Sequence, residues 1–166
     1  MSKHNFILFW GGVYSQWCPS KFKIDGVEYN TAEQYMMAKK ALLFGDYEIL
    51  AEIMSTKNPA TQKDCGKRVK NFNKEVWETY CRKYVYDGNY AKFTQNPKML
   101  AELMATGDKE IVEASPEDKI WGIGLDENNP LAWDKDTWKG TNWLGIAIME
   151  VRAKLIEEGW LKTKSE

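Results

Sequence analysis

Residues 31–45, Thr-Ala-Glu-Gln-Tyr-Met-Met-Ala-Lys-Lys-Ala-Leu-Leu-Phe-Gly, predict a helix whose beginning and end are both marked in the sequence. Thr31 can cap the N-terminus, and Gln34 has the spacing of its capping-box partner. Gly45 stands where helices commonly end. Apolar residues face nearly every side of this helix, so we expect it to be buried.

Two charged residues of this helix point in the same direction. Glu33 and Lys40 are seven residues apart, close to two turns, and they share one side with Met36, Met37 and Phe44. Along the axis they are about 10 Å apart, a spacing that suits the two sides of a small ligand. A carboxylate in the first turn and an amine in the last also complement the helix dipole, which is an ordinary structural role.

The apolar surroundings favour a functional role for this pair, because burying an unpaired charge is costly. A desolvated lysine can lose its proton and act as a nucleophile. A carboxylate beside it can serve as a general acid or base. Lys39 points elsewhere, and we expect it to be an ordinary surface lysine.

Composition indicates one domain, residues 1–166, with 43 % hydrophobic residues for its core. Eight Trp, eight Tyr and six Phe can fill that core or line a pocket for a flat ligand. The net charge of −1 excludes a basic footprint for nucleic acid over the whole chain. A local basic run, residues 63–70, is more often a solvated helix face than a phosphate site.

The cysteines, Cys18, Cys65 and Cys81, show no metal-ligand spacing, and the single histidine is His4. A metal site is therefore not expected. The odd number of cysteines suits a reducing, cytoplasmic location. Residues 6–10 are too short for the apolar part of a signal peptide, and no apolar run has the length of a membrane span, so neither is expected.

The class predicted from the pattern of elements is α+β, a single mostly helical domain with a few short strands. Strands are expected at residues 5–10, in a hairpin over 22–29 with its turn at Asp25-Gly26, at 111–114, and in a glycine-broken form at 119–124. Helices are expected at 31–45, 46–55, 59–67, 73–86 with an interruption at Asp87-Gly88, 97–106, and 142–158 capped by Thr141 or Asn142.

Residues 115–124 form a second candidate constellation. Trp121 offers a ring face to a heterocycle, and Gly122 and Gly124 would let backbone approach a ligand closely. A glycine-kinked segment with a core Trp explains the same residues equally well. Asp118 either orients a partner or starts a turn. At the start of the last helix, residues 139–145 suit a phosphate or, more simply, a plain helix cap.

Short motifs along nearly the whole chain are specific as a set. They are the hairpin Phe22–Tyr29 leading into Ala32-Glu33 and Tyr35; Lys40 with Phe44; Gly66 and Arg68; Trp77; Lys92-Phe93; Leu103, Thr106 and Gly107; Ile111 to Ser115, Asp118, and Trp121 to Gly124; and Asn142, Leu144 and Gly145 ahead of Met149 to Arg152. In this order and spacing, from Phe9 to about Leu155, the chain resembles the YbiA-like NADAR domain family of N-glycosidases. On residue pattern alone, Trp77 is expected in the core and Lys92 on the surface.

The resemblance implies a hydrolase that cleaves the bond between a base and a ribose, with no metal or redox cofactor. Some members act on phosphoribosylamino-pyrimidine intermediates of riboflavin synthesis, and others remove ADP-ribose from modified guanine in nucleic acid. The loop Tyr14-Ser15-Gln16-Trp17 departs from the family's Phe-Ser-Asn-Phe, and this leaves the choice of substrate open.

The resemblance also assigns roles to residues. The catalytic residues it implies are Glu33, Lys40 and Asp118, with Lys40 forming a Schiff base at C1 of the opened sugar. The substrate-binding residues are expected to be Trp77, Trp121, Arg68, Gly122 and Asn142. Trp77 and Trp121 would hold the flat base between them.

Two other functions compete with this one. In the first, the chain is a non-catalytic module that binds ADP-ribose or a related nucleotide. In the second, it is a nucleic-acid-associated factor that uses the basic run. The expected partner is a small nucleotide-like molecule or an ADP-ribosylated guanine in nucleic acid, with no membrane. The oligomeric state stays open.

Overall fold

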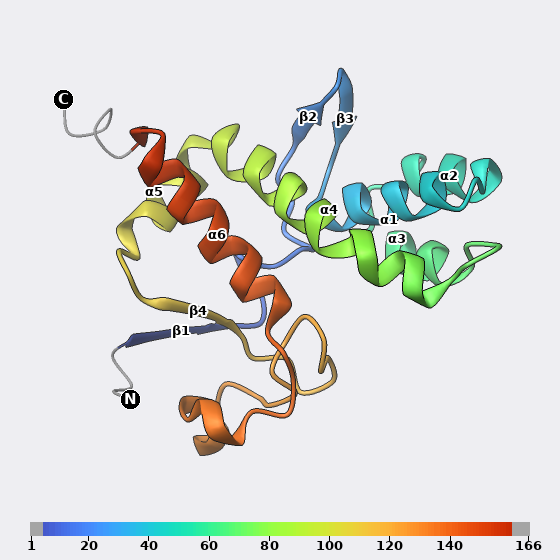
Figure 1. Ribbon diagram of the computed structural model, residues 1–166. Helices are drawn as coiled ribbons and strands as arrows, with labels where there is room; N and C mark the ends of the chain where they lie inside the picture. Colours follow the sequence, from blue (N-terminus) through green and yellow to red (C-terminus); the bar gives the residue numbers. More distant parts are fainter. Residues whose placement is uncertain (1–4, 161–166) are drawn as a thin grey trace. The chain divides into compact units, whose positions relative to one another are not determined.

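The structure, a computed structural model, describes residues 5–160 and divides the chain into two units (Figure 1). Residues 16–97 form the helical unit, and residues up to 15 together with those from 98 form the sheet unit. The predicted α+β class, mostly helical with a few short strands, is confirmed. A single domain spanning 1–166 stays a prediction, and His4 lies outside the described residues.

The helical unit is built around the predicted central helix. Its elements are β2 Phe22–Ile24, β3 Val27–Tyr29, α1 Ala32–Leu43, α2 Tyr47–Met54, α3 Pro59–Lys67 and α4 Lys74–Thr94. Helix α1 packs against α2, α3 and α4, as Figure 1 shows. Its first seven residues, from Ala32 to Ala38, are all buried, which confirms the expected burial, whereas Leu42 near its end is 41 % exposed.

Side-chain hydrogen bonds fix the beginning of α1. Thr31 Oγ1 accepts from Gln34 N at 2.9 Å, and Gln34 Oε1 accepts from Asn30 N at 2.7 Å. The predicted cap is therefore present, with Gln34 reaching one residue further back than in the usual capping box. Gly45 follows the helix with φ +73°, a conformation that favours glycine.

A buried polar network joins α1 to α2 and α3. Thr31 Oγ1 donates to Gln62 Oε1 at 2.7 Å, and Gln62 Nε2 donates to Thr56 O at 2.9 Å. Gln34 Nε2 donates to Ile53 O at 3.0 Å and to Thr56 O at 3.1 Å. Because buried amides are costly unless hydrogen-bonded, these paired groups specify where α1 begins against its neighbours.

The predicted β2–β3 hairpin is confirmed, with Phe22 paired to Tyr29. Asp25 and Gly26 both have positive φ, 52° and 81°, as a two-residue hairpin turn requires. The Tyr35 ring on α1 packs edge-on against Tyr29, with centroids 5.0 Å apart. This contact joins the hairpin to α1.

Helix α4 differs from the prediction because it runs without a break through Gly88. A Cβ at Gly88 would lie 2.9 Å from Tyr35 Cδ2, so glycine here allows α4 to approach α1 closely. In the sequence this glycine predicts a helix break, but in the structure it permits the close packing of α4 on α1. In the unbroken helix Lys92 falls on the same side as Val85 and Asn89, and all three are buried.

The sheet unit pairs two strands from opposite ends of the chain. Strands β1 Phe6–Phe9 and β4 Glu110–Glu113 are parallel, with Phe6 opposite Glu110. The remaining elements are α5 Pro97–Ala105, whose Pro97 closes the helical unit, two short 3-10 turns η2 Pro130–Trp133 and η3 Lys135–Thr137, and α6 Trp143–Glu157. Helix α6 packs on β4 through its predicted apolar set, Leu144, Ile148, Val151 and Leu155.

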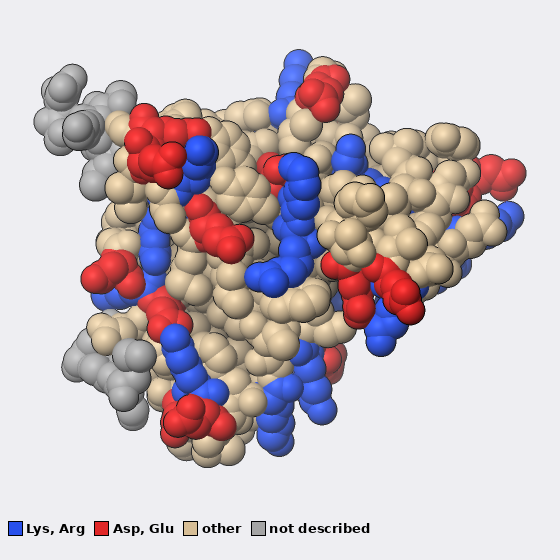
Figure 2. All heavy atoms as spheres, in the orientation of Figure 1, with Lys and Arg blue, Asp and Glu red and all other residues tan. Residues whose placement is uncertain are grey.

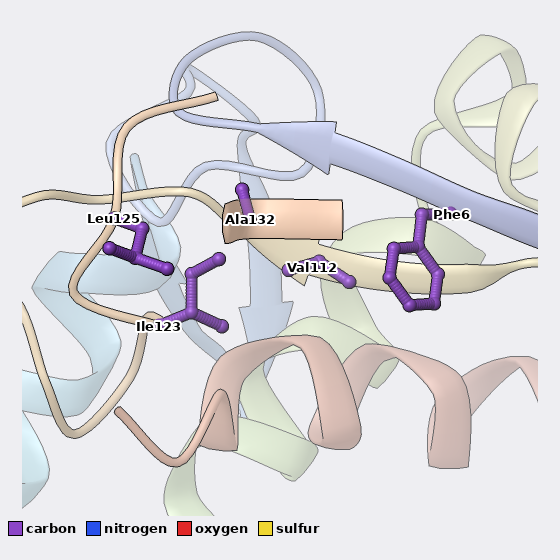
Figure 3. Close-up of a cluster of buried hydrophobic side chains, with 5 residues drawn as sticks. All are labelled: Phe6, Val112, Ile123, Leu125 and Ala132. Carbon is purple, nitrogen blue, oxygen red and sulfur yellow. The ribbon is translucent and has the colours of Figure 1, made fainter. Parts of the chain in front are cut away.

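The core of the sheet unit includes residues from both strands and from the long connection before α6. Its buried cluster consists of Phe6, Val112, Ile123, Leu125 and Ala132 (Figure 3). Trp133 stacks on Phe6 with ring centroids 6.2 Å apart. These contacts anchor the polar connection to the sheet.

Residues 119–124, expected to be strand-like, form no strand. Asp118 Oδ1 accepts from the backbone N of Ile120 and of Trp121, which turns the chain before a strand can begin. Gly122 then packs against backbone, since a Cβ there would lie 2.9 Å from Glu113 O. The glycines that suggested an interrupted strand belong to a tightly packed loop.

Gly145 allows α6 to approach β4 closely. A Cβ at Gly145 would overlap with Ile111 O, a backbone atom that the sheet holds in place. We expect Gly145→Ala to lower the free energy of unfolding by about 2–3 kcal/mol through overpacking. Gly11→Ala is the matched control, because no atom lies within 4 Å of a Cβ there. Equal urea midpoints for the two variants would contradict this prediction.

Within residues 5–160, none of the helices combines the length and the apolar character needed to cross a bilayer.

Candidate functional site

Lys40, in the last turn of α1, lies against two aromatic rings. Its Nζ is 4.7 Å from the centroid of the Phe72 ring and 5.4 Å from that of Trp77. Phe72 comes from the α3–α4 connection, and Trp77 from the first turn of α4. We call these three residues, together with Glu33, the Lys40 cluster.

The environment of Lys40 makes its amine easier to deprotonate than that of a solvated lysine. Partial burial lowers the pKa of Lys40 below its ordinary 10.5, while the Glu33 carboxylate acts in the opposite direction. Glu33 is only 5 % exposed, so the predicted inward carboxylate is present. Because it influences the Lys40 amine electrostatically, the two charged groups form one cluster, as their spacing predicts.

Backbone contacts hold Glu33 at the beginning of α1. Its N–H donates to Gln16 O at 3.0 Å, so Gln16 lies beside the first turn. The cap and buried network at Thr31 and Gln34 fix the same turn from the other side. The sequence therefore places Glu33 on the most constrained part of the helix.

The aromatic members of the Lys40 cluster differ from expectation. Trp77 is half-buried rather than a core residue, since it lies in the first part of α4, where residues 74–76 and 78–80 are all exposed. Phe72, 46 % exposed, lies outside every motif considered above. An aromatic residue in a short connection, just before the helix cap Asn73, was the signal that would have identified it.

Asp46 supports the connection that carries Phe72. Its Oδ1 accepts from Ile49 N at 3.1 Å and caps α2, and its Oδ2 accepts from Lys70 N at 2.9 Å. The hydrogen bonds from Lys70 N and Ile49 N lower the pKa of Asp46. One buried carboxylate thus ties the start of α2 to residue 70, two residues before the ring.

Asp46→Asn is expected to destabilise the fold at neutral pH and much less in acid. A carboxyl whose pKa is lowered on folding stabilises the protein above its unfolded value, ordinarily 3.8, and this contribution is lost as pH falls through the folded pKa. Thermal unfolding at neutral pH and at about pH 3 measures the change. Asp64→Asn, which removes an exposed ion pair with Arg68, is the control and should change little. If Asp46→Asn lowered the unfolding temperature by the same amount at both pH values, the prediction would be refuted.

Lys39 is set apart from Lys40, as predicted, but it is not simply a surface lysine. It is half-buried, and its Nζ lies 5.8 Å from the Tyr35 ring centroid and 5.7 Å from that of Tyr84. The two neighbouring lysines therefore contact different aromatic rings.

The surface position expected for Lys92 is wrong. The side chain is 0 % exposed, and burial lowers the pKa of Lys92 to about 8, partly offset by the Cys18 thiol. The reason is the unbroken course of α4, which carries residue 92 onto the buried side.

Arg68 binds its neighbours on the surface of the helical unit. Its guanidinium pairs with Asp64 at 3.2 Å and with Glu52 at 3.5 Å. Its predicted contact with substrate stays a prediction. The other basic residues of the run, Lys63, Lys67 and Lys70, are exposed, which fits the solvated helix face. On the face shown in Figure 2, basic and acidic side chains are interspersed.

The remaining predicted site residues lie in the sheet unit. Asp118 starts the turn described above, which is one of its two predicted roles. Trp121 is half-buried and packs edge-on against Trp143, with centroids 5.7 Å apart. Gly122 is buried against backbone.

Asn142 has a structural role that the sequence did not indicate. It occupies the N-cap of α6 with φ 54°, but its side chain makes no cap hydrogen bond, contrary to one of the two predicted caps. Instead Oδ1 accepts from Glu113 N at 2.9 Å and Nδ2 donates to Ile111 O at 3.1 Å. Both amide atoms therefore hold β4 to α6.

The structure brings together Glu33, Lys40 and Trp77, and adds Phe72. Asp118, Trp121, Gly122 and Asn142 form a second group around the 115–125 loop. That the two groups form one site, with the base held between Trp77 and Trp121, stays a prediction. Among residues 5–160, no group of three or more His, Cys, Asp or Glu side chains could hold a metal ion.

Known proteins resemble this chain over most of its length. An N-glycosidase of Acanthamoeba polyphaga mimivirus is 46 % identical over 145 residues, 84 % of this chain and 85 % of that protein. Protein irg-1 of Caenorhabditis elegans is 34 % identical over 179 residues, covering 97 % of this chain and 84 % of its own length.

A solved structure extends the comparison to the fold. The NMR structure of Escherichia coli YbiA matches with a TM-score of 0.78 and 27 % identity, over 96 % of this chain and 90 % of that one. The corresponding protein is named an N-glycosidase. These relatives confirm the predicted class of enzyme, a hydrolase acting on N-glycosyl bonds. Residues 8–156 match the NADAR domain, and the chain therefore belongs to the NADAR domain family.

Proposed function

We propose that this protein hydrolyses the N-glycosidic bond between a base and a ribose through a Schiff base on Lys40. The observation that carries the proposal is the Lys40 amine itself. Partial burial lowers its pKa, two aromatic rings lie against it, and a buried carboxylate occupies the same side of α1. An amine with this environment is better suited to nucleophilic attack than a solvated lysine.

Glu33 is proposed to act as the general acid in the first step and as the general base in the second. As the bond from C1 to the base breaks, its electron pair goes to the base nitrogen, which takes a proton from Glu33. Lys40 Nζ forms a bond to C1. The ring bond from C1 to oxygen then opens, and the ring oxygen takes the proton that Nζ loses, leaving a C1–Nζ iminium.

Water completes the reaction. It adds to C1 and gives a proton to the Glu33 carboxylate. The proton of the new C1 hydroxyl then passes to Nζ as the C1–Nζ bond breaks, which leaves the sugar with a C1 aldehyde and Lys40 with its neutral amine. Trp77 is proposed to offer its half-buried ring to the base, because flat heterocycles stack well on indole.

The sugar is proposed to belong to one of two substrate classes, a phosphoribosylamino-pyrimidine or an ADP-ribosylated guanine. Base release from both, followed in parallel by mass spectrometry, tests the activity and selects between them. Release from one class supports the proposal, and release from neither contradicts it. Binding of ADP-ribose without any release would favour the non-catalytic module. Action in the cytoplasm is part of the same proposal.

A further inference from the structure

Two amides beside the first turn of α1 leave one donor and one acceptor unused. Asn89 Nδ2 donates to Val85 O and to Gln16 Oε1, both at 2.8 Å. Among residues 5–160, the other atom of each amide, Gln16 Nε2 and Asn89 Oδ1, is buried and makes no hydrogen bond. The Asn89 side chain is 0 % exposed, and Gln16 is half-buried.

Exchanging the amide oxygen and nitrogen positions does not repair this arrangement. Turning Asn89 would bring its oxygen against Val85 O, and turning Gln16 would bring two donors together. The existing contacts therefore determine both orientations. The pair is left with a donor on Gln16 and an acceptor on Asn89, and buried polar groups of this kind are costly unless another molecule satisfies them.

The two unused atoms are close to each other, and the backbone of Gln16 contacts that of Glu33. Each shares an amide carbon with an atom of the 2.8 Å bond between Asn89 and Gln16, so they are at most about 7 Å apart. The Gln16 backbone carbonyl also accepts the Glu33 N–H at 3.0 Å. The pair thus adjoins the residue to which the proposed function gives the proton transfers.

We infer that Gln16 and Asn89 bind a hydroxyl group of the substrate's sugar. The hydroxyl oxygen accepts from Gln16 Nε2, and its hydrogen goes to Asn89 Oδ1. This inference rests on the proposed function, which brings a ribose beside Glu33. It adds a recognition role for Gln16, in the loop that departs from the family's pattern.

Hydrogen-bonding capacity favours a hydroxyl over the charged groups of a nucleotide-like substrate. A carboxylate or phosphate oxygen has no hydrogen for Asn89 Oδ1, and an ammonium has no lone pair for Gln16 Nε2. A hydroxyl both donates and accepts through one small atom, which suits two groups that close packing surrounds. Gln16 is the partly exposed residue of the two, so the inference places the sugar on its side of the pair.

The test combines ligand and protein changes in a cycle. Calorimetry measures the binding of ribose 5-phosphate, its 2-deoxy and 3-deoxy analogues, and ADP-ribose to the wild type and to Gln16→Met. In the wild type, one deoxy analogue should bind about tenfold more weakly than ribose 5-phosphate, the effect of one lost hydrogen bond. In Gln16→Met this difference should shrink to less than about twofold.

Two further variants guard against a folding artefact. Gln16→Glu keeps an oxygen for Asn89 Nδ2 but removes the donor, so it should also lose the discrimination. Gln95→Met is the matched control, because both amide atoms of Gln95 already bind the Lys23 backbone at 2.8 Å. It should retain the tenfold difference.

Three results would overturn the inference: equal binding of all three sugar phosphates by the wild type, a deoxy effect that persists in Gln16→Met and Gln16→Glu, or no binding of either ribose 5-phosphate or ADP-ribose. Failure of the proposed mechanism is separate, because it is measured by turnover of Lys40→Ala. A Lys40→Ala enzyme that turns over, together with a deoxy effect lost in Gln16→Met, would refute the mechanism and leave this inference standing.

Discussion

Lys40→Ala should lose base release by at least about a thousandfold, the scale expected when an acting nucleophile is removed. Borohydride added with substrate should leave a covalent mass increment on the wild-type peptide that contains Lys40, and none on the variant. The reason is chemical, because no iminium can form without the amine. Mass spectrometry of the trapped and digested protein measures both outcomes.

Lys39→Ala is the control for this experiment. Lys39 is the adjacent lysine, is also half-buried, and contacts Tyr35 and Tyr84 instead of the Lys40 cluster. It should retain trapping on Lys40. Full turnover by Lys40→Ala, or a mass increment on residue 39, would contradict the mechanism.

The trapping rate should also depend on pH in a particular direction. Since burial lowers the pKa of Lys40, the neutral amine accumulates at lower pH than for a solvated lysine. Trapping should therefore rise with pH, with a midpoint below the ordinary lysine pKa of 10.5. A midpoint at or above that value would show that the amine is not desolvated in solution.

Glu33→Gln should lower turnover by about 10²–10⁴-fold, the usual contribution of a general acid or base. The amide preserves the size of the side chain and cannot exchange protons. Substrates with a better leaving group should be affected less, because they need less help from the acid. Steady-state base release from a normal and an activated substrate measures the two effects.

Glu48→Gln controls for the charge at a helix N-terminus. Glu48 occupies the first turn of α2, as Glu33 does in α1, but it is exposed. The change should leave turnover unaltered, since only the dipole interaction is lost. A Glu33→Gln enzyme with wild-type rates for both substrates would remove Glu33 from the chemistry.

Local signals in the sequence were sufficient for most of the helical unit. A cap, a periodic apolar pattern and a glycine together placed α1, and a positive-φ pair placed the hairpin turn. The spacing of Glu33 and Lys40 needed only the helical period. Each of these features depends on residues within a few positions of one another, which is why the sequence could reveal them.

Features that depend on distant contacts were missed. The low helix propensity of glycine predicts an interruption at Gly88, but α4 continues through it. The glycine is required there by the Tyr35 ring on α1. Lys92 was misplaced for the same reason, because its burial follows from the continuation of α4. Asn142 binds the β4 backbone some 30 residues away instead of capping α6. The contribution of Phe72 to the Lys40 cluster depends on how the α3–α4 connection folds over α1.

Phe72 can be varied more freely than the residues of α1 that it lies beside. The proposed reacting groups are on a helix whose first turn is fixed by buried amides, whereas this ring belongs to a short connection and is 46 % exposed. Substitutions at position 72 can therefore alter the wall beside the amine at little cost to the core. In protein engineering this makes residue 72 a suitable first position to randomise when a different base is to be accepted, with α1 left untouched.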